Sequence, residues 1–405
     1  MRPAASLHAG DLVAVQLPPG PRWPELVAQA WEARAALLPI DDRWSTEEVG
    51  AVLERGRPTV VLDAEGARRC SNGVPVEAGI ALVMATSGST GQPRLVELSC
   101  SAVRAAVEAS ASTLGAGPRD GWLSCLPMAH IGGLLVVLRS LLLRAPLQVL
   151  ERFHPEALAR ALDRDGGGRV AFTSVVPTML VRLLDAGVDL TSLRGILVGG
   201  SGLSSRLRAR AAAAGARCVS TYGQTESCGG VVYDGVPLAG VRLRISPEGE
   251  VELGGDTLMR GYRLDEQASR SALSGDGWLR TGDAGYFDAE GRLRVTGRLD
   301  EAIVSGGEKV WPGEVEEVLR EHPGVADVAI SARADELWGS AVVAFVVPAD
   351  PASPPTLPEL RDFASLRLAR YKAPRGLRIC SRLPRGSLGK PKREEVQRWA
   401  RTTSW

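Results

Sequence analysis

Residues 80–94 read IALVMATSGSTGQPR, a five-residue apolar run followed at once by a loop rich in glycine and hydroxyl side chains that ends on a proline and a cation. The apolar run is typical of a buried strand. Glycines let backbone N–H groups approach an anion closely, the hydroxyls add donors, and Arg94 adds a positive charge. The stretch therefore predicts a strand followed by a phosphate-binding loop. Its composition is also typical of a surface turn, and it lacks the Walker pattern G-x-x-x-x-G-K-[ST].

The composition of the chain excludes several classes of protein. Its 405 residues include 48 basic and 47 acidic side chains, and this balance argues against general binding to nucleic acid or to a membrane surface. Six cysteines without a C-x-x-C spacing indicate reduced thiols in a cytoplasmic protein and no structural zinc site. The longest apolar stretch, 131–143, contains Arg139 and predicts a buried helix rather than a membrane span. Residues 1–10 lack the apolar region of a signal peptide.

Strand-like and helix-like segments alternate along the first half of the chain. Short apolar runs predict the strands, and longer Ala-, Leu- and Arg-rich segments of helical period predict the helices between them. This alternation favours parallel sheets flanked by helices. The strands are expected within 11–17, 59–63, 80–86, 146–151, 170–176, 195–200 and 218–222, and the helices within 24–38, 101–114, 155–165, 177–187 and 203–215.

The pattern changes twice further along the chain. After Tyr222, short segments separated by turns predict a small antiparallel β region. From residue 299, a helical segment, two strands, a proline-rich break and another helix predict a separate α+β domain. The sequence thus predicts an α/β chain with a large N-terminal domain over 1–298 and a smaller C-terminal domain over 299–405.

Five further motifs contain residues that can carry chemistry. They are LPMAHIGG (126–133), STYGQTES (220–227), LRTGDAG (279–285), GRLDEAIVSGGEKVWPGEVE (297–316) and LPRGSLGKPKREE (383–395). Taken singly, each has an ordinary structural explanation: a packed histidine, a solvated glutamate, a turn-capping aspartate or an exposed lysine. Their order and number make a common function the better explanation.

Together with the loop at 85–94, these motifs resemble the adenylate-forming superfamily of acyl-CoA synthetases, peptide-synthetase adenylation domains and beetle luciferases. The resemblance covers about residues 10–398, and SGGEKVWPGEVEEVL, HPGVADVAISARADELWG and YKAP resemble the o-succinylbenzoate–CoA ligases of menaquinone synthesis. It implies an AMP-forming acid–thiol ligase that uses ATP, Mg²⁺ and coenzyme A. A carboxylate would attack the α-phosphorus of ATP, and the CoA thiolate would then displace AMP from the acyl-adenylate.

The resemblance also implies roles for individual residues in the adenylation step. Lys390 would bridge the carboxylate and the α-phosphate, Glu226 would hold Mg²⁺ with Thr225, and His130 would line the passage between the acid pocket and the pantetheine tunnel with Gly132 and Gly133. The β- and γ-phosphates would lie against Thr86, Ser87, Gly88, Ser89, Thr90, Gly91 and Arg94. Adenosine would lie against Gly199, Gly200, Ser201, Tyr222, Gly223 and Gln224. Asp283 would bind the ribose, and Arg298 would reach the ribose or a phosphate.

A mobile C-terminal domain is implied as well, since two half-reactions need different groups at one centre. Asp300 would be the hinge, and Gly306, Gly307 and Glu308 would face the centre in the second orientation and build the CoA tunnel.

Two departures from the family pattern lead to expectations. Arg94 stands where a lysine is usual, which keeps the charge but changes its geometry, so altered pyrophosphate release is expected. The chain begins at what resembles the family's first core strand, and a homodimer partner could cover the resulting face. The cationic helix with Arg206, Arg208 and Arg210 is expected to be a solvated face rather than a site for a second carboxylate.

The acid itself is left open. Alternatives are another aryl- or acyl-CoA ligase, a stand-alone adenylation enzyme that loads a carrier protein, and a catalytically silent nucleotide-binding protein.

Overall fold

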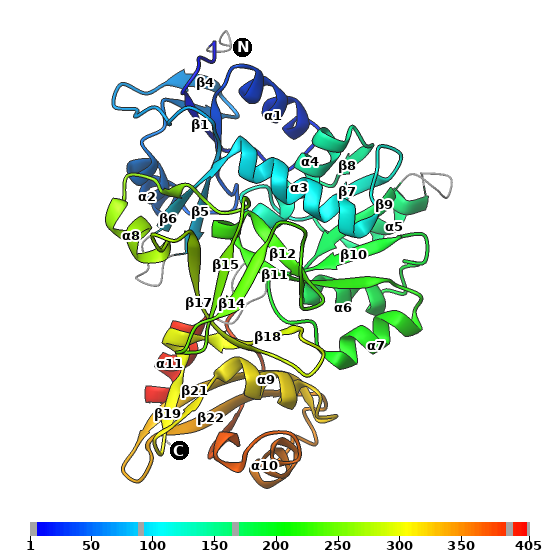
Figure 1. The fold of residues 1–405 in the computed structure, drawn as a ribbon. Helices are drawn as coiled ribbons and strands as arrows, with labels where there is room; N and C mark the ends of the chain where they lie inside the picture. The colour runs from blue at the N-terminus through cyan, green and yellow to red at the C-terminus, as the bar shows by residue number, and fades with distance from the viewer. Residues whose placement is uncertain (1–5, 88–92, 164–169, 386–391, 403–405) are drawn as a thin grey trace. The chain divides into compact units, whose positions relative to one another are not determined.

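The computed structural model describes residues 6–87, 93–163, 170–385 and 392–402 (Figure 1). The chain divides into two compact units, each with most of its contacts inside itself. Unit 1 comprises Met1–Gly199, Ala211–Arg244 and Glu252–Thr281, and unit 2 comprises Gly200–Arg210, Ile245–Val251 and Gly282–Trp405. Among the described residues, no helix combines the length and the apolar character that a membrane span requires.

The first sheet of unit 1 has seven strands in the order β16-β6-β5-β2-β1-β3-β4. Strand β1 runs parallel to β2 and β3, and β2 runs parallel to β5, whereas β4, β6 and β16 are antiparallel to their neighbours. All four residues of β1 are buried, as expected for a central parallel strand. The strands are β1 Leu12–Val15, β2 Ala36–Pro39, β3 Val60–Asp63, β4 Gly66–Arg69, β5 Ile80–Ser87, β6 Pro93–Ser99 and β16 Gly261–Tyr262.

The second sheet also has seven strands, in the order β13-β12-β11-β10-β9-β7-β8. Strands β11, β10, β9, β7 and β8 are mutually parallel, and β12 and β13 extend one edge in antiparallel orientation. Trp122 of β7 and Phe172 of β9 stack with ring centroids 5.0 Å apart in its core. The strands are β7 Gly121–Ser124, β8 Leu147–Val149, β9 Val170–Val175, β10 Gly195–Val198, β11 Cys218–Gln224, β12 Gly229–Tyr233 and β13 Val236–Pro237.

Helices accompany both sheets (Figure 1). They are α1 Trp23–Glu32, α2 Thr46–Gly56, α3 Cys100–Leu114, α4 Ile131–Leu143, α5 Pro155–Asp163, α6 Pro177–Asp185, α7 Ser205–Ala213 and α8 Glu266–Ala272. Helix α4 is the buried helix expected over 131–143, and it packs against α3. Helix α2 begins with a capping box, in which the Ser45 side chain accepts from the Glu48 amide and the Glu48 carboxylate accepts from the Ser45 amide.

The helix predicted over 24–38 is wrong in its second half. Helix α1 ends at Glu32, Arg34 adopts a φ of 57°, and residues 36–39 form β2. Ala and Leu favour helix in isolation, but all four residues of β2 are buried between β1 and β5, and this burial outweighs local propensity.

The later part of the chain forms smaller sheets. Strands β14 Arg242–Ile245, β15 Glu250–Gly254, β17 Trp278–Phe287 and β18 Leu293–Arg298 form a four-stranded sheet, in which β17 and β18 are antiparallel. A two-stranded hairpin follows in unit 2, made of β19 Ile303–Ser305 and β20 Glu308–Val310.

A three-stranded sheet, β21 Val325–Asp335, β22 Gly339–Pro348 and β23 Gly376–Ile379, packs with α9 Pro312–Arg320 and α11 Arg393–Thr402 in unit 2. Helix α10 Leu357–Ser365 packs against α9. Helices α9 and α10 share a core with the sheet that includes Val315, Leu319 and Leu360, whereas Val396 and Ala400 of α11 pack in a second core with Phe345 of β22. The predicted α/β class, with a large N-terminal part and a smaller α+β part after it, is confirmed.

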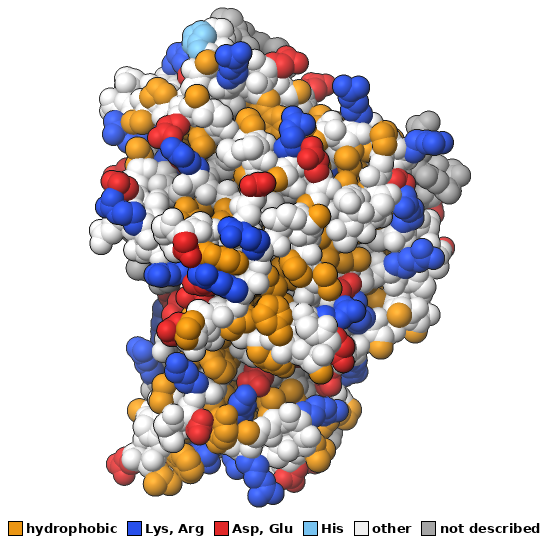
Figure 2. Space-filling model, viewed as in Figure 1, with side chains coloured by type: hydrophobic (Ala, Val, Ile, Leu, Met, Phe, Trp, Pro, Cys, Tyr) orange, Lys and Arg blue, Asp and Glu red, His pale blue; other side chains and the backbone are white. Residues whose placement is uncertain are grey.

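Basic and acidic side chains are interspersed on the face of the molecule seen in Figure 2. This pattern agrees with the near-balance of charge in the sequence.

Candidate active site

The strand expected before the phosphate-binding loop is β5, and β6 begins after it. Thr86 lies opposite Arg94 in the β5–β6 register, and the Thr86 hydroxyl donates to the Arg94 carbonyl oxygen at 3.4 Å. Ser87 is the last residue of β5. Gly88, Ser89, Thr90 and Gly91 lie outside the described residues.

The STYGQTES motif forms the end of β11 and a single 3-10 turn, Thr225–Ser227. Gly223 has a φ of +155°, and a Cβ there would lie 1.9 Å from the carbonyl oxygen of Gly229, so only glycine fits. The Gln224 amide donates to the Ser227 hydroxyl at 3.0 Å and closes the turn. The turn thereby fixes the backbone on both sides of Glu226.

Glu226 is a buried carboxylate, 8% exposed. Its Oε1 atom accepts a hydrogen bond from the Tyr262 hydroxyl at 2.9 Å, and its carbonyl oxygen accepts from the Met259 amide at 2.8 Å. Burial, together with the adjacent Glu226 carboxylate, raises the pKa of Tyr262 well above its usual range, so the phenol remains a donor. Within the described part of the chain, the side-chain partner of Glu226 is thus a neutral hydroxyl and not a cation.

A buried carboxylate whose hydrogen-bond partner is a neutral hydroxyl fits a hard divalent cation. The described residues hold no cluster of three or more His, Cys, Asp and Glu side chains that could bind a metal by themselves. Magnesium commonly takes only one or two carboxylates and completes its coordination with water and substrate phosphates. The residues around Glu226 therefore fit Mg²⁺ that arrives with a nucleotide.

His130 is the residue before α4 and lies beside an acid that the sequence motifs did not single out. Its Nε2 atom is 3.8 Å from Oδ2 of Asp41, which is 2% exposed. Arg43 donates to that carboxylate through Nε at 2.7 Å and Nη2 at 2.6 Å. Burial alone would raise the pKa of Asp41, but the hydrogen bonds and charge of Arg43 hold it below its usual value. An ionised Asp41 therefore faces His130.

Of the two glycines that follow His130 and Ile131, packing requires glycine only at 133. A Cβ on Gly133 would lie 2.3 Å from the Pro127 carbonyl oxygen, whereas a Cβ on Gly132 would meet only Leu126 at 3.8 Å. The first turn of α4 thus depends on glycine at 133.

In unit 2, three predicted residues share one ion-pair network. Arg298 Nη1 is 3.2 Å from Asp283 Oδ1, and Arg298 Nε is 3.5 Å from Asp300 Oδ1. Asp283 and Arg298 are direct partners in the β17–β18 register. Burial alone would lower the pKa of Arg298, but the two carboxylates raise it. The predicted ribose-binding acid and the predicted hinge acid therefore contact the same guanidinium.

The second glycine-rich loop is the turn of the β19–β20 hairpin. Gly306 and Gly307 have φ of +60° and +86°, the left-handed conformation that two-residue hairpin turns require. The Gly306 amide donates to the Trp338 carbonyl oxygen at 2.9 Å. Glu308 is exposed beside them. The loop is therefore a shaped, solvent-facing turn.

The remaining predicted residues fall into three groups. A Cβ on Gly199 would lie 2.7 Å from the Thr221 hydroxyl oxygen, so the backbone there is close-packed. Gly200, Ser201, Arg206 and Arg210 are exposed. Lys390 lies outside the described residues.

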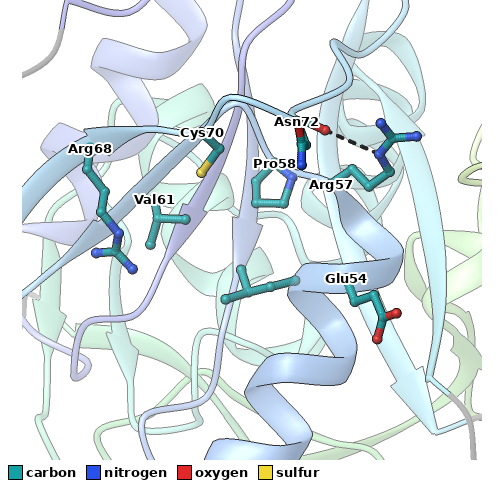
Figure 3. Close-up of a pocket in the computed structure, with 8 residues that line it drawn as sticks. Glu54, Arg57, Pro58, Val61, Arg68, Cys70 and Asn72 are labelled. Atoms are coloured by element: carbon teal, nitrogen blue, oxygen red, sulfur yellow. Dashed lines mark hydrogen bonds between the residues drawn. The ribbon is translucent and has the colours of Figure 1, made fainter.

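A pocket of about 570 Å³ lies elsewhere in unit 1 (Figure 3). It is lined by the end of α2 and by strands β3 and β4, and Arg57 Nε donates to the Asn72 carbonyl oxygen at its rim, at 3.2 Å. None of the predicted site residues lines it.

The fold has two sheets with parallel strands at their centres, a turn after β11 that carries a buried carboxylate, and a following α+β unit. These are the parts of an adenylate-forming enzyme. Residues 72–263 match the AMP-binding enzyme family, and residues 314–390 match the AMP-binding enzyme C-terminal domain. The chain belongs to the AMP-binding enzyme family, as its motifs predicted.

Its curated relatives include 2-succinylbenzoate–CoA ligases. The chain is 40% identical over 334 residues to the Mycobacterium tuberculosis protein named "Probable 2-succinylbenzoate--CoA ligase", covering 80% of this chain and 86% of that protein. It is 34% identical over 370 residues to the 2-succinylbenzoate–CoA ligase of Bacillus licheniformis, covering 84% of this chain and 76% of the relative. The predicted resemblance to this group of ligases is confirmed.

The solved structures give the same result. The o-succinylbenzoate CoA synthetase of Bacillus subtilis, in complex with the acyl-adenylate OSB-AMP, superposes with a TM-score of 0.84 at 28% identity, over 96% of this chain and 89% of that one. The same Bacillus subtilis enzyme has also been solved with ATP and magnesium ion, with the same TM-score of 0.84.

Proposed function

We propose that this protein is an ATP-dependent acid–CoA ligase that works through an acyl-adenylate, and that its acid is o-succinylbenzoate. The observation that carries the proposal is the buried Glu226 carboxylate, shaped for a metal–nucleotide complex, in a chain 40% identical to a protein named as a 2-succinylbenzoate–CoA ligase. ATP, Mg²⁺ and CoA are the cofactors and co-substrates that this activity requires.

In the first half-reaction, a carboxylate oxygen of the acid attacks the α-phosphorus of ATP. The bond from the α-phosphorus to the bridging oxygen breaks, and pyrophosphate leaves with the electron pair. Two anions must meet, so the protein's task is to supply positive charge and orientation. Arg94 and the loop after Thr86 supply charge and donors to the phosphates, and Glu226 with Thr225 holds Mg²⁺, which neutralises phosphate charge when bound.

Lys390 completes this centre by contacting the acid's carboxylate and the α-phosphate. Tyr222, Gly223 and Gln224 bind adenosine together with Gly199, and Asp283 accepts hydrogen bonds from the ribose hydroxyls. A carboxylate suits this last task because it offers two acceptor oxygens.

In the second half-reaction, the CoA thiolate attacks the acyl carbon and AMP leaves. His130 lines the path of the pantetheine arm, and the ionised Asp41 lies 3.8 Å from its Nε2 atom. We assign the C-terminal part, from residue 299, to a mobile domain that turns at Asp300 and presents Lys390 in one orientation and the turn at Gly306 in the other. The enzyme acts in the cytoplasm on small molecules, and a homodimer is its proposed assembly.

The experiment compares acids and separates the two half-reactions. CoA-dependent AMP formation is measured with o-succinylbenzoate, substituted benzoates, short fatty acids and amino acids, using the wild type, Lys390→Ala and the exposed neighbour Lys392→Ala as a charge-matched control. We expect o-succinylbenzoate to be preferred by about 100-fold in kcat/KM, which is about 2.7 kcal/mol of transition-state discrimination. Lys390→Ala should abolish adenylation, and Lys392→Ala should not.

Other outcomes decide among the alternatives. A different preferred acid would remove the substrate assignment and keep the ligase. Pyrophosphate exchange without CoA turnover, restored by a phosphopantetheine-bearing carrier protein, would favour the carrier-loading alternative. Nucleotide binding without AMP formation from any acid would overturn the proposal in favour of a silent binding protein.

A further inference from the structure

Residues 259–263 connect the turn that carries Glu226 to the first sheet, and all of these contacts lie within unit 1. The Met259 amide donates to the Glu226 carbonyl oxygen at 2.8 Å, and the Arg263 amide donates to the Leu95 carbonyl oxygen at 2.7 Å. The Arg263 guanidinium is buried and donates to the Gly56 carbonyl oxygen at 2.7 Å. The segment between them therefore has little freedom to move relative to either the turn or the sheet.

Tyr262 lies in the middle of this segment and contacts two residues of the proposed site. Its hydroxyl donates to Glu226 Oε1 at 2.9 Å, and the Arg94 guanidinium carbon lies 5.4 Å from the centroid of its ring. The β16–β6 register explains the second contact: Tyr262 lies opposite Val96, and Arg94 is two residues further along β6 on the same face. Tyr262 is 9% exposed, so its own side of both contacts is largely shielded from water, and Arg94 is half-buried.

We infer that Tyr262 is a positioning residue for Mg²⁺ binding, which acts by holding the Glu226 carboxylate and is itself held by Arg94. The inference rests on the proposed function, because the role of Glu226 as a metal ligand is part of it. One carboxylate oxygen is committed to the phenol, and this fixes the rotation of the whole group. A ligand that is already oriented binds a metal more tightly than one that must be ordered first.

Arg94 takes part in this arrangement, and it stands where a lysine is usual in the family. A planar guanidinium stacks on an aromatic face better than the compact ammonium of a lysine does. The replacement of the usual lysine by Arg94 thus links the phosphate-binding loop, through the ring of Tyr262, to the metal-binding carboxylate. Nucleotide phosphates and metal would then be held by one connected set of side chains.

The experiment measures equilibrium binding of ATP to the full-length protein by calorimetry, in EDTA and across a titration of MgCl₂. Tyr262→Phe keeps the ring and removes the hydroxyl. We expect the Mg²⁺ concentration that half-saturates ATP binding to rise about 10- to 100-fold, the usual effect of losing a group that orients a metal ligand. ATP binding in EDTA should stay within about twofold of the wild type, because the hydroxyl acts through Glu226.

Two further variants keep the test decisive. Tyr233→Phe removes another buried tyrosine hydroxyl, one that contacts Ser110 and Arg139, and it should leave the Mg²⁺ requirement unchanged. Arg94→Lys keeps the charge at a half-buried position, and should raise the half-saturating Mg²⁺ concentration about threefold by loosening the ring. If Tyr262→Phe does not unfold cooperatively, and so is not properly folded, Arg94→Lys takes its place as the test of the positioning role.

The outcomes separate the two proposals. If the wild type binds ATP equally with and without Mg²⁺, the metal role of Glu226 fails, and the proposed function loses its metal site. If the wild type requires Mg²⁺ but Tyr262→Phe, or Arg94→Lys in its place, has the same requirement, the positioning role of Tyr262 is refuted and the proposed function stands.

Discussion

Replacing Glu316 by glutamine should loosen the part of unit 2 that follows Lys390 in the sequence. The Glu316 carboxylate on α9 is 2% exposed. It accepts hydrogen bonds from the Ile330 amide of β21 at 2.8 Å and from Arg393 Nη2 at 3.1 Å. Arg393 is the first residue of α11. The carboxylate therefore joins α9, β21 and α11 at one buried point.

The expected loss of stability follows from these contacts. Removing one partner of a buried ion pair costs about 3–5 kcal/mol, because the other charge is left uncompensated. The Arg393 side chain is 28% exposed and keeps a second acid, Glu301, at 3.1 Å, so a smaller loss applies. We expect Glu316→Gln to lower the local free energy of opening by about 2–3 kcal/mol, which speeds amide exchange about 30- to 150-fold.

Hydrogen exchange followed by mass spectrometry measures this effect in peptides from β21 and α11. Glu317→Gln, at the exposed neighbouring position, removes the same charge and should leave these peptides unchanged. Exchange of the β21 peptide within about twofold of the wild type in Glu316→Gln would refute the reasoning, since no buried anchor would then have been lost. A matching change in Glu317→Gln would assign the effect to net charge instead.

Three further predictions concern folding. Burial alone would raise the pKa of Asp11, but hydrogen bonds from Arg69 and the other donors to Asp11 lower it below 3.8. The stability that Asp11 contributes is therefore lost as the pH falls through that lowered pKa. In urea melts between about pH 5 and pH 2, the wild type should lose more stability than Asp11→Asn. In Gly223→Ala the new Cβ would lie 1.9 Å from a carbonyl oxygen, so this variant should destabilise the protein by about 2–4 kcal/mol and weaken ATP binding. Its control is Gly50→Ala, at a position on α2 with open space around it, which should stabilise the protein by about 0.5–1 kcal/mol in the same melts. The buried Arg139 donates to two hydroxyls and, among the described residues, has no acid in an ion pair. Arg139→Met should therefore leave the stability of the protein unchanged or raise it by about 1 kcal/mol. A loss of more than about 2 kcal/mol of stability in the melts would contradict this prediction.

Periodicity predicted the elements whose local pattern agrees with their burial. The apolar run before Thr86 forms β5, and the stretch 131–143 forms the buried helix α4. It was wrong for residues 36–39, where a helix-favouring composition is buried in the centre of a sheet. The local sequence pattern does not show which segments the tertiary fold will bury, and here burial in the sheet outweighed the helical propensity of these residues.

The chemistry of the site was easier to predict than its supporting residues. Glu226 and His130 stand in the motifs STYGQTES and LPMAHIGG, which belong to the set whose order and number indicated a common function. Tyr262 and Asp41 stand in no such motif. Tyr262 contacts Glu226 across 36 residues of sequence, and Asp41 contacts His130 across 89 residues (130 − 41). Only the β16–β6 register and the burial of β2 bring these residues to the site.

The transfer of an oxygen atom from the acid tests the central claim most directly. The wild type is given ATP, CoA and o-succinylbenzoate labelled with ¹⁸O in its carboxylates, and the nucleotide and phosphate products are analysed by mass spectrometry. Attack on the α-phosphorus, followed by release of AMP from the acyl carbon, leaves one carboxylate oxygen on AMP, so labelled AMP and unlabelled pyrophosphate are predicted. Label in orthophosphate together with ADP would show an acyl phosphate instead, and would contradict the acyl-adenylate mechanism.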